Sequence, residues 1–261
     1  PDGKALERSE NISEGEKHIS IDTENPELWW PNNFGKQPLY NVRVTLAENG
    51  AVLDEKTYRI GLRTLKVKRN KDQWGESFCF VVNGVEIFSM GADYIPEDNI
   101  LARMNRERTE KLIKSCVEAN FNSIRVWGGA FYPADYFYDL CDEYGLIVWQ
   151  DFMFACGVYE LTDQFKETVI KEAVDNVKRL RHHASLGLWC GNNEQEQGWV
   201  EWGWNEKCSA KLREDYLQLY EKILPEIVRE NDPETFYWPA SPSSKGGFVE
   251  PNSENMGDMH Y

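Results

Sequence analysis

The segment from Leu186 to Trp204 turns from an apolar run into the polar sequence Asn192-Asn193-Glu194, with four tryptophans within nineteen residues. A carboxyl group flanked by aromatic surface is partly desolvated, which raises its pKa and keeps it protonated closer to neutral pH. Aromatic rings beside such a group suit the apolar C–H faces of a sugar, and a protonated carboxyl is the general acid that glycoside cleavage requires. Glu194 is therefore the candidate catalytic residue. The alternative is an ordinary loop residue that caps a helix or forms a salt bridge.

Other short apolar runs also end in side chains that a packed core would not place there. The runs are Ile87–Met90, Ser123–Trp127, Leu146–Gln150, Leu186–Cys190 and Thr235–Trp238, and a weaker one begins near Met256. The side chains at their ends are Asp93, Trp127, Asp151, Asn193, Glu194, Ser241 and His260. Working residues in a (β/α)8 barrel lie at the C-terminal ends of the strands, which favours a barrel mouth. For Asp151 the favoured role is a simple hydrogen bond to neighbouring backbone.

Helical patterns separate these runs. Apolar residues recur at helix spacing in the segments 112–117, 136–144, 165–180 and 212–223, and Gly145 is placed to end the second. Strands that alternate with helices form a parallel sheet. A doubly wound sheet would carry a Gly-rich turn after its first strand, but "GADYIPED" follows instead. The fold class is therefore α/β, as a (β/α)8 TIM barrel with about five or six strands present.

The first part of the chain has a different pattern. Alternating apolar residues around the turn Asn49-Gly50 predict an antiparallel hairpin, and Asn83-Gly84 predicts a second one within residues 78–90. The segment 25–40 is expected to be an ordered loop. Two or three strands do not make a stable domain alone. We predict residues 1–68 to be the last part of a β-sandwich, and residues 69–261 to be the first part of the barrel.

Composition narrows the function classes. The net charge of −15 argues against a nucleic-acid partner, and no apolar run reaches transmembrane length, so no membrane partner is expected. The six cysteines include no CxxC pair and mostly have apolar neighbours, which predicts free, buried thiols rather than disulfides or a metal site. No cofactor is predicted. The segment carries no signal peptide, so the compartment is left open.

Five blocks in this order resemble family 2 glycoside hydrolases, and within them the β-mannosidase branch. The blocks are "NPELWWPNNFGKQPLYNVRVTL", "FVVNGVEIFSMGADYIPED", "SIRVWGGAFY", "GLIVWQDFMFACGVY" and "LWCGNNEQEQGW". The resemblance implies a retaining exo-glycosidase that acts on a carbohydrate substrate. It also implies that an immunoglobulin-like sandwich precedes the catalytic barrel. A periplasmic, secreted or lysosomal location would suit the family.

The resemblance also assigns roles. It implies that Glu194 is the acid/base and that Asn193 hydrogen-bonds the sugar 2-hydroxyl. Trp127 resembles the tryptophan that the mannosidase branch places beside the sugar, where β-galactosidases and β-glucuronidases usually have His. Trp202 resembles a second aromatic of the pocket, with helix packing as an equal alternative.

The nucleophile is expected outside this chain. In the family it is a Glu on the seventh strand, so this chain alone is predicted to be inactive and to need the remainder of its polypeptide to complete the barrel. Two other functions stay open: a β-galactosidase or β-glucuronidase of the same family, and a non-catalytic carbohydrate-binding module.

Overall fold

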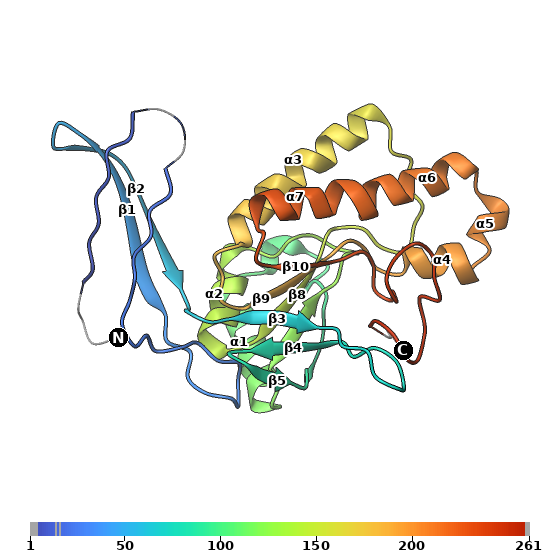
Figure 1. The fold of residues 1–261 in the computed structure, drawn as a ribbon, viewed down its shortest axis with the longest axis horizontal. Coiled ribbons are helices and arrows are strands. Elements are labelled where there is room, and N and C mark those ends of the chain that lie inside the picture. The colour runs from blue at the N-terminus through green and yellow to red at the C-terminus, as the bar shows by residue number, and fades with distance from the viewer. Residues whose placement is uncertain (1–4, 14, 16, 259–261) are drawn as a thin grey trace.

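A computed structural model describes residues 5–13, 15 and 17–258 (Figure 1). Its central element is a five-stranded parallel sheet in the order β10-β9-β8-β7-β6. The strands are β6 Gly91–Tyr94, β7 Ser123–Val126, β8 Ile147–Asp151, β9 Leu186–Cys190 and β10 Phe236–Trp238. The predicted alternation of strands and helices is confirmed, because neighbouring parallel strands need long crossover connections. The weak run near Met256 continues into residues 259–261, and His260 lies outside the described residues.

The first parallel strand is not the predicted run Ile87–Met90. Ile87 ends an antiparallel strand and is buried in another layer, whereas the Phe88 side chain is 81% exposed. The strand begins at Gly91 instead. A Cβ atom there would lie 2.0 Å from the backbone oxygen of Ser123, so the two strands approach closely where no side chain intervenes. The apolar run Ile87–Met90 therefore reflects the burial of Ile87 and does not mark a strand of the parallel sheet.

Both predicted hairpins are present. Each turns at an Asn-Gly pair in which both residues have positive φ, as type I′ turns require. Asn49-Gly50 joins β1 Tyr40–Glu48 to β2 Ala51–Ile60, and Asn83-Gly84 joins β4 Cys79–Val82 to β5 Val85–Ile87. The β1-β2 hairpin stands away from the rest of the chain in Figure 1, and its apolar side chains are largely exposed: Val44, Leu46, Val52 and Leu53.

The segment around the predicted domain boundary forms one small sheet. Strand β3 Leu65–Lys68 pairs with β4, in the order β3-β4-β5. Hydrogen bonds thus join the two sides of the boundary placed after residue 68, and the division into domains stays a prediction. The preceding loop is ordered: Trp29 is fully buried and its indole N–H donates to the carbonyl of Asp142, 2.8 Å away.

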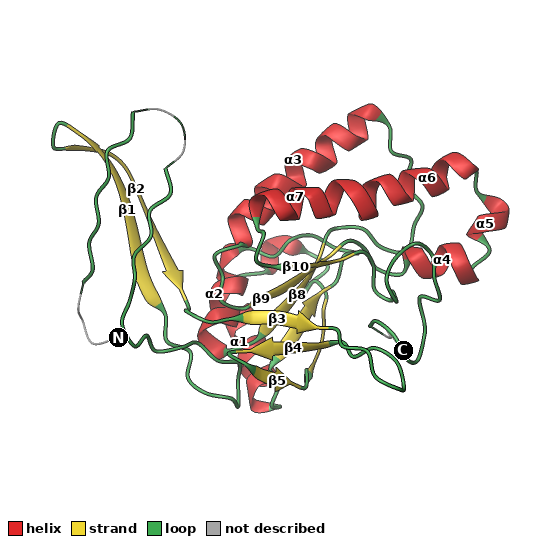
Figure 2. Cartoon of the chain, viewed as in Figure 1, coloured by secondary structure: helices red, strands yellow, loops and turns green. Residues whose placement is uncertain are grey.

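Helices cover one face of the parallel sheet, as Figure 2 shows for α3 and α7. The helices are η1 Leu101–Arg103, α1 Arg106–Glu118, α2 Asp135–Tyr144, α3 Asp163–Leu180, α4 Gln195–Glu201, α5 Trp204–Lys207, α6 Ala210–Gln218 and α7 Leu224–Asn231. Gly145 ends α2 with φ 76°, as predicted. The fourth predicted helix is interrupted, because a π-helical turn, η2 Leu219–Ile223, separates α6 from α7. Within the described residues, no helix has the length and apolarity needed to cross a bilayer.

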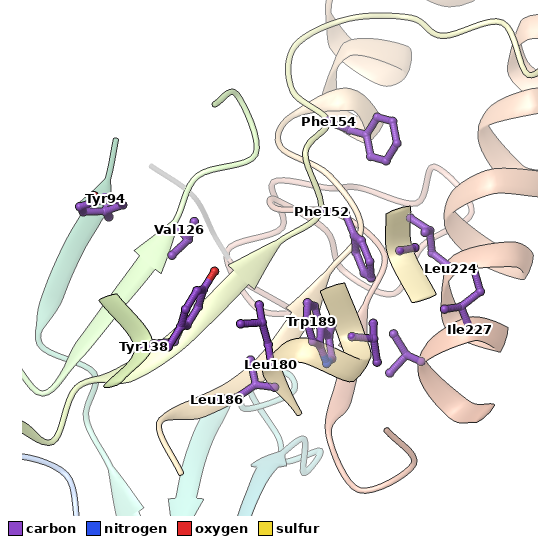
Figure 3. Close-up of a cluster of buried hydrophobic side chains, with 14 of the residues drawn as sticks. Tyr94, Val126, Tyr138, Phe152, Phe154, Leu180, Leu186, Trp189, Leu224 and Ile227 are labelled. Carbon is purple, nitrogen blue, oxygen red and sulfur yellow. The ribbon is translucent and has the colours of Figure 1, made fainter. Parts of the chain in front are cut away.

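Two apolar cores lie on opposite faces of the parallel sheet. Figure 3 shows the larger one, where Phe152 and Trp189 lie toward Leu224 and Ile227 of α7, and Val126 of β7 lies near Tyr138 of α2. The smaller core lies between the parallel sheet and β3-β4-β5. Along β8, Val148 belongs to the helix-side core and Ile147 and Trp149 belong to the other. Because side chains alternate along a strand, Asp151 shares the second face with Ile147 and Trp149.

Candidate active site

Asn192 holds the turn that links β9 to α4. Its Oδ1 accepts from the backbone N–H of Gln195 at 3.1 Å, and its Nδ2 donates to the carbonyl of Pro239 at 3.0 Å. Glu194 takes the N-cap position of α4 with φ 62°, but its carboxylate does not cap the helix. N-capping therefore does not account for this glutamate. Of the three polar residues Asn192-Asn193-Glu194, Asn192 therefore has a structural role in the turn. The side chains of Asn193 and Glu194 make other contacts, described below.

The ends of three neighbouring strands meet around Asn193. Its backbone bridges to Ala155 beyond β8 and to Ser241 beyond β10, in the parallel sense. The N–H of Glu194 donates to the carbonyl of Ser241 at 2.8 Å, and the N–H of Cys156 donates to the carbonyl of Asn193 at 3.0 Å. The fold thus gathers residues from three separate crossovers at one edge of the sheet.

A buried ion pair supports this edge. Arg125 Nε and Nη2 lie 3.2 and 2.9 Å from the two carboxylate oxygens of Asp151, whose side chain is fully buried. The backbone N–H of Gly128 and the indole N–H of Trp149 donate to the same carboxylate. Burial alone lowers the pKa of Arg125, but its acidic neighbours, with Asp151 foremost, together outweigh burial, and the pKa lies above its ordinary value. Asp151 therefore does more than bond neighbouring backbone.

A chain of hydrogen bonds leads from this ion pair to Glu194. Arg125 Nη2 donates to Asn193 Oδ1 at 2.9 Å, and Asn193 Nδ2 lies 3.3 Å from the sulfur of Cys156. That sulfur lies 3.0 Å from Glu194 Oε2. Desolvation, together with the hydrogen bond and charge of Glu194, raises the pKa of Cys156 to about 11. Asp93 lies at the outer end, with its carboxylate 3.9 Å from Arg125 Nη1.

The two candidate tryptophans each follow a residue of this network closely in the chain: Trp127 comes two residues after Arg125, and Trp202 eight residues after Glu194. Trp127 follows β7, is half-buried, and its ring lies against Gly129, where a Cβ atom would be 1.9 Å away. Trp202 follows α4 with 36% of its surface exposed and meets Trp204 edge-on, with ring centres 5.4 Å apart. These contacts are with chain neighbours, so the placement of both rings beside a sugar stays a prediction.

Sequence reasoning missed two residues of this network, Arg125 and Cys156. A signal existed for the first: Arg125 stands between Ile124 and Val126 in a buried strand, on the face that alternation assigns to Asp151. The cysteines are free, as predicted, but only Cys141 and Cys190 are buried: Cys79, Cys116 and Cys208 are partly buried, and the expectation fails outright for Cys156, which is exposed. It lies in the loop after β8, five residues beyond Asp151, where the strand-end rule applies equally.

A second carboxyl near Glu194 in sequence faces the protein interior. Glu196 on α4 is fully buried, and its Oε1 accepts from the backbone N–H of Phe248 at 2.9 Å. Burial raises the pKa of Glu196 to about 7, partly offset by hydrogen bonds from Ser243 and Phe248. Glu196 thus anchors α4 to the loop after β10. Across the described part of the chain, no group of three or more His, Cys, Asp or Glu side chains is arranged to hold a metal ion.

The raised pKa of Glu196 predicts a pH-dependent stability. Its folded pKa of about 7 lies above the value of about 4.3 in an unfolded chain, so the folded state binds more protons between these values. Stability from this group is therefore lost as pH rises from about 4 to 7. We expect Glu196→Gln to raise the thermal midpoint at pH 8 and to change it little at pH 4.5, by calorimetry. Glu226→Gln, at an exposed position of α7, is the control. Equal shifts at both pH values would contradict the prediction.

Comparison with known proteins shows a consistent set of relatives. The protein-family model described as "Glycosyl hydrolases family 2" matches residues 2–63 of the sequence. A β-mannosidase B from Aspergillus terreus is 43% identical over 249 residues, covering 93% of this chain and 29% of the relative. The crystal structure of a β-D-mannosidase from Dictyoglomus thermophilum superposes with a TM-score of 0.84 at 42% identity, covering 91% of this chain and 28% of that one.

A more distant structure shares the fold alone. The exo-chitosanase CsxA of Amycolatopsis orientalis superposes with a TM-score of 0.69 at 19% identity, over 91% of this chain and 25% of that one. The chain therefore spans roughly 30% of the length of the curated relatives that it matches.

Proposed function

Because the chain belongs to family 2 of the glycosyl hydrolases, we propose that it supplies the acid/base part of a retaining exo-β-mannosidase. The observation that carries this proposal is the position of Glu194: at the carboxyl ends of parallel strands, in hydrogen-bond contact with Cys156 and next to the anchored amide of Asn193. The mannoside specificity rests on the relatives, which are named β-mannosidases and match nearly the whole of this chain.

We further propose that the parallel sheet is part of a (β/α)8 barrel and that β1-β2 belongs to an immunoglobulin-like sandwich. Helices lie on one face of the sheet, which would be the outside of the barrel. On the other face, Ile147 and Trp149 are followed by the ionic Asp151 toward the carboxyl end. A packed inner face that becomes polar at the carboxyl ends of the strands is the arrangement of a barrel with its site at that end.

In this proposal Glu194 protonates the glycosidic oxygen and then deprotonates the attacking water. Asn193 recognises the sugar 2-hydroxyl. Its amide oxygen is already taken by Arg125, and one amide hydrogen is directed to Cys156. An amide nitrogen carries two hydrogens, so the second is available to a sugar oxygen. Trp127 and Trp202 provide apolar surface for the ring.

A retaining mechanism needs a second carboxyl, about 5–5.5 Å from the acid/base, as nucleophile. The obvious neighbours of Glu194 are committed elsewhere: Asp151 is held by Arg125, and Glu196 is buried against Phe248. We propose that the nucleophile comes from the remainder of the polypeptide, consistent with a chain that spans under a third of its relatives. The isolated 261-residue chain would then be inactive.

The experiment that tests the proposal is a panel of aryl β-glycosides, offered to the full-length protein and to the 261-residue chain. Turnover by the full-length protein with the mannoside preferred, and no turnover by the 261-residue chain, would support the proposal. Preference for the galactoside or glucuronide would place the protein elsewhere in the family. Saccharide binding without turnover by the full-length protein would make it a binding module. Turnover by the chain alone, abolished by Glu194→Gln, would show that the nucleophile lies within it.

Specificity provides a further prediction. The family resemblance implies a histidine in the neighbourhood of Trp127 in β-galactosidases and β-glucuronidases. We expect Trp127→His to lower kcat/KM for the aryl β-mannoside, by about tenfold or more, because a large apolar contact area is lost. Trp74→His, at a tryptophan that is 76% exposed in the loop before β4, is the matched control. Unchanged kinetics in the Trp127 variant would remove this residue from the site.

A further inference from the structure

We propose that Cys156 is a positioning residue of the acid/base, whose thiol accepts a hydrogen bond from Asn193 and donates one to Glu194. The proposal rests on the acid/base role proposed above for Glu194. It goes beyond that role because it assigns a task to a side chain of another strand end, the loop after β8. The supporting distances are 3.3 Å from Asn193 Nδ2 to the sulfur and 3.0 Å from the sulfur to Glu194 Oε2.

The direction of each hydrogen bond is fixed by groups that can act only as donors. A guanidinium only donates, so the amide oxygen of Asn193 must face Arg125 and its nitrogen must face the thiol. An amide nitrogen only donates, so the sulfur accepts this bond. The single S–H proton is then free to point at Glu194 Oε2, which accepts as a carboxylate. One directed chain of hydrogen bonds thus runs from the Asp151–Arg125 ion pair to the acid/base.

The backbone holds the thiol and the carboxylate face to face. Cys156 has φ 50° and Glu194 has φ 62°, both in the left-handed region that residues other than glycine rarely adopt. The Cys156 N–H donates to the carbonyl of Asn193, the residue just before Glu194, at 3.0 Å. Two residues with unfavourable backbone conformations, tied together by this hydrogen bond, persist only because the surrounding fold holds both backbones in place.

The hydrogen bond has a predictable effect on the acid/base. Donation to the charged form of a carboxyl lowers its pKa, so removing the thiol raises the pKa of Glu194. The charged groups around the thiol are Glu194 and Arg125, with Asp151 and Asp93 behind the latter. Loss of Cys156 leaves these other charges in place. Since the thiol is itself hard to ionise beside Glu194, it stays a donor through the neutral pH range.

The first test measures the pH dependence of kcat/KM in the full-length protein with Cys156→Ala and Cys156→Ser. Activity falls on the basic side when the acid loses its proton. We expect Cys156→Ala to lose about tenfold in kcat/KM and to move this basic limb up by about one pH unit. Cys156→Ser, which keeps a donor, should restore the limb. A uniform loss at every pH with no shift, or a serine variant that behaves like alanine, would overturn the proposal.

The second test does not depend on turnover. Iodoacetamide alkylation of Cys156 is followed by peptide mass spectrometry against pH, in the native protein and in Glu194→Gln. Removing the neighbouring negative charge should lower the pKa of the thiol and raise its alkylation rate near pH 8 by about tenfold. The buried Cys141 and Cys190 serve as internal controls. Equal rates in both proteins would overturn the contact, even if no glycoside were turned over and the proposed function failed.

Discussion

Glu194→Gln in the full-length protein is expected to slow hydrolysis of an alkyl β-mannoside by about 10²–10⁴-fold, the usual contribution of a general acid–base. Gln keeps the shape of the side chain, and its amide can still contact the thiol of Cys156, but it has no proton of suitable acidity to transfer. The backbone turn should persist, because Asn192 and Ser241 hold it through bonds that do not involve the Glu194 carboxylate.

The loss should depend on the leaving group. A dinitrophenolate departs with little protonation, so dinitrophenyl β-mannoside should lose far less in the first step than an alkyl mannoside. Glu206→Gln, at an exposed position of the short helix α5, controls for a general effect of removing a carboxylate. The measurement is the initial velocity of the native protein and of the variants with each of the two substrates. Equal losses for the two leaving groups would refute the acid/base role.

Asp151→Asn is expected to destabilise the fold by about 3–5 kcal/mol, because it removes the buried partner of Arg125 and leaves that charge with only Asp93, which is 3.9 Å away and 49% exposed. Arg125 is 12% exposed and Asp151 is fully buried. Gly128 and Trp149 donate to different oxygens of the carboxylate, so the variant also presents an amide N–H₂ to one of these two N–H groups. The cost is measured as a shift in the denaturant midpoint of the transition that includes this sheet.

An exposed pair provides the control. Glu167 and Lys171 on α3 form an ion pair with side chains 68% and 71% exposed, and such pairs contribute about 0–1 kcal/mol. Glu167→Gln should therefore leave the midpoint nearly unchanged. An Asp151→Asn midpoint as close to that of the native protein as the Glu167 control would show that the buried pair is not needed for the fold.

The sequence alone was sufficient where a local rule decides the structure. The Asn-Gly turns adopt positive φ because no partner elsewhere is needed for that preference, and Gly145 ends α2 for the same reason. The apolar spacing of 165–180 marks one face of α3 correctly, since a helix repeats every 3.6 residues whatever it packs against. The change from apolar to polar residues also predicted the strand ends near Asp151 and Asn193 correctly.

Local rules failed where the deciding contact comes from another layer. Ile87 is apolar because it belongs to the small sheet and is buried in the core between that sheet and the parallel one, and the parallel strand starts only where Gly91 lets β6 approach β7. The π turn η2 interrupts a helix whose apolar spacing gives no sign of a break. Within that turn, Tyr220 accepts a hydrogen bond at its carbonyl from the hydroxyl of Tyr237 in β10. These features depend on packing between segments far apart in the chain.

The candidate site divides in the same way. The residue types and their positions at strand ends identified Asn193 and Glu194, because parallel strands bring their carboxyl ends to one edge whatever the loops do. Sequence position could place Arg125 and Cys156 at the same strand ends, but it did not pair them with Asn193 and Glu194. Arg125 and Cys156 lie 68 and 38 positions before the residues that they contact, and hydrogen bonds over such separations exist only once the crossovers have been packed. Tertiary structure alone therefore determined which side chain orients the carboxyl group, since that choice depends on distances of about 3 Å between separate loops.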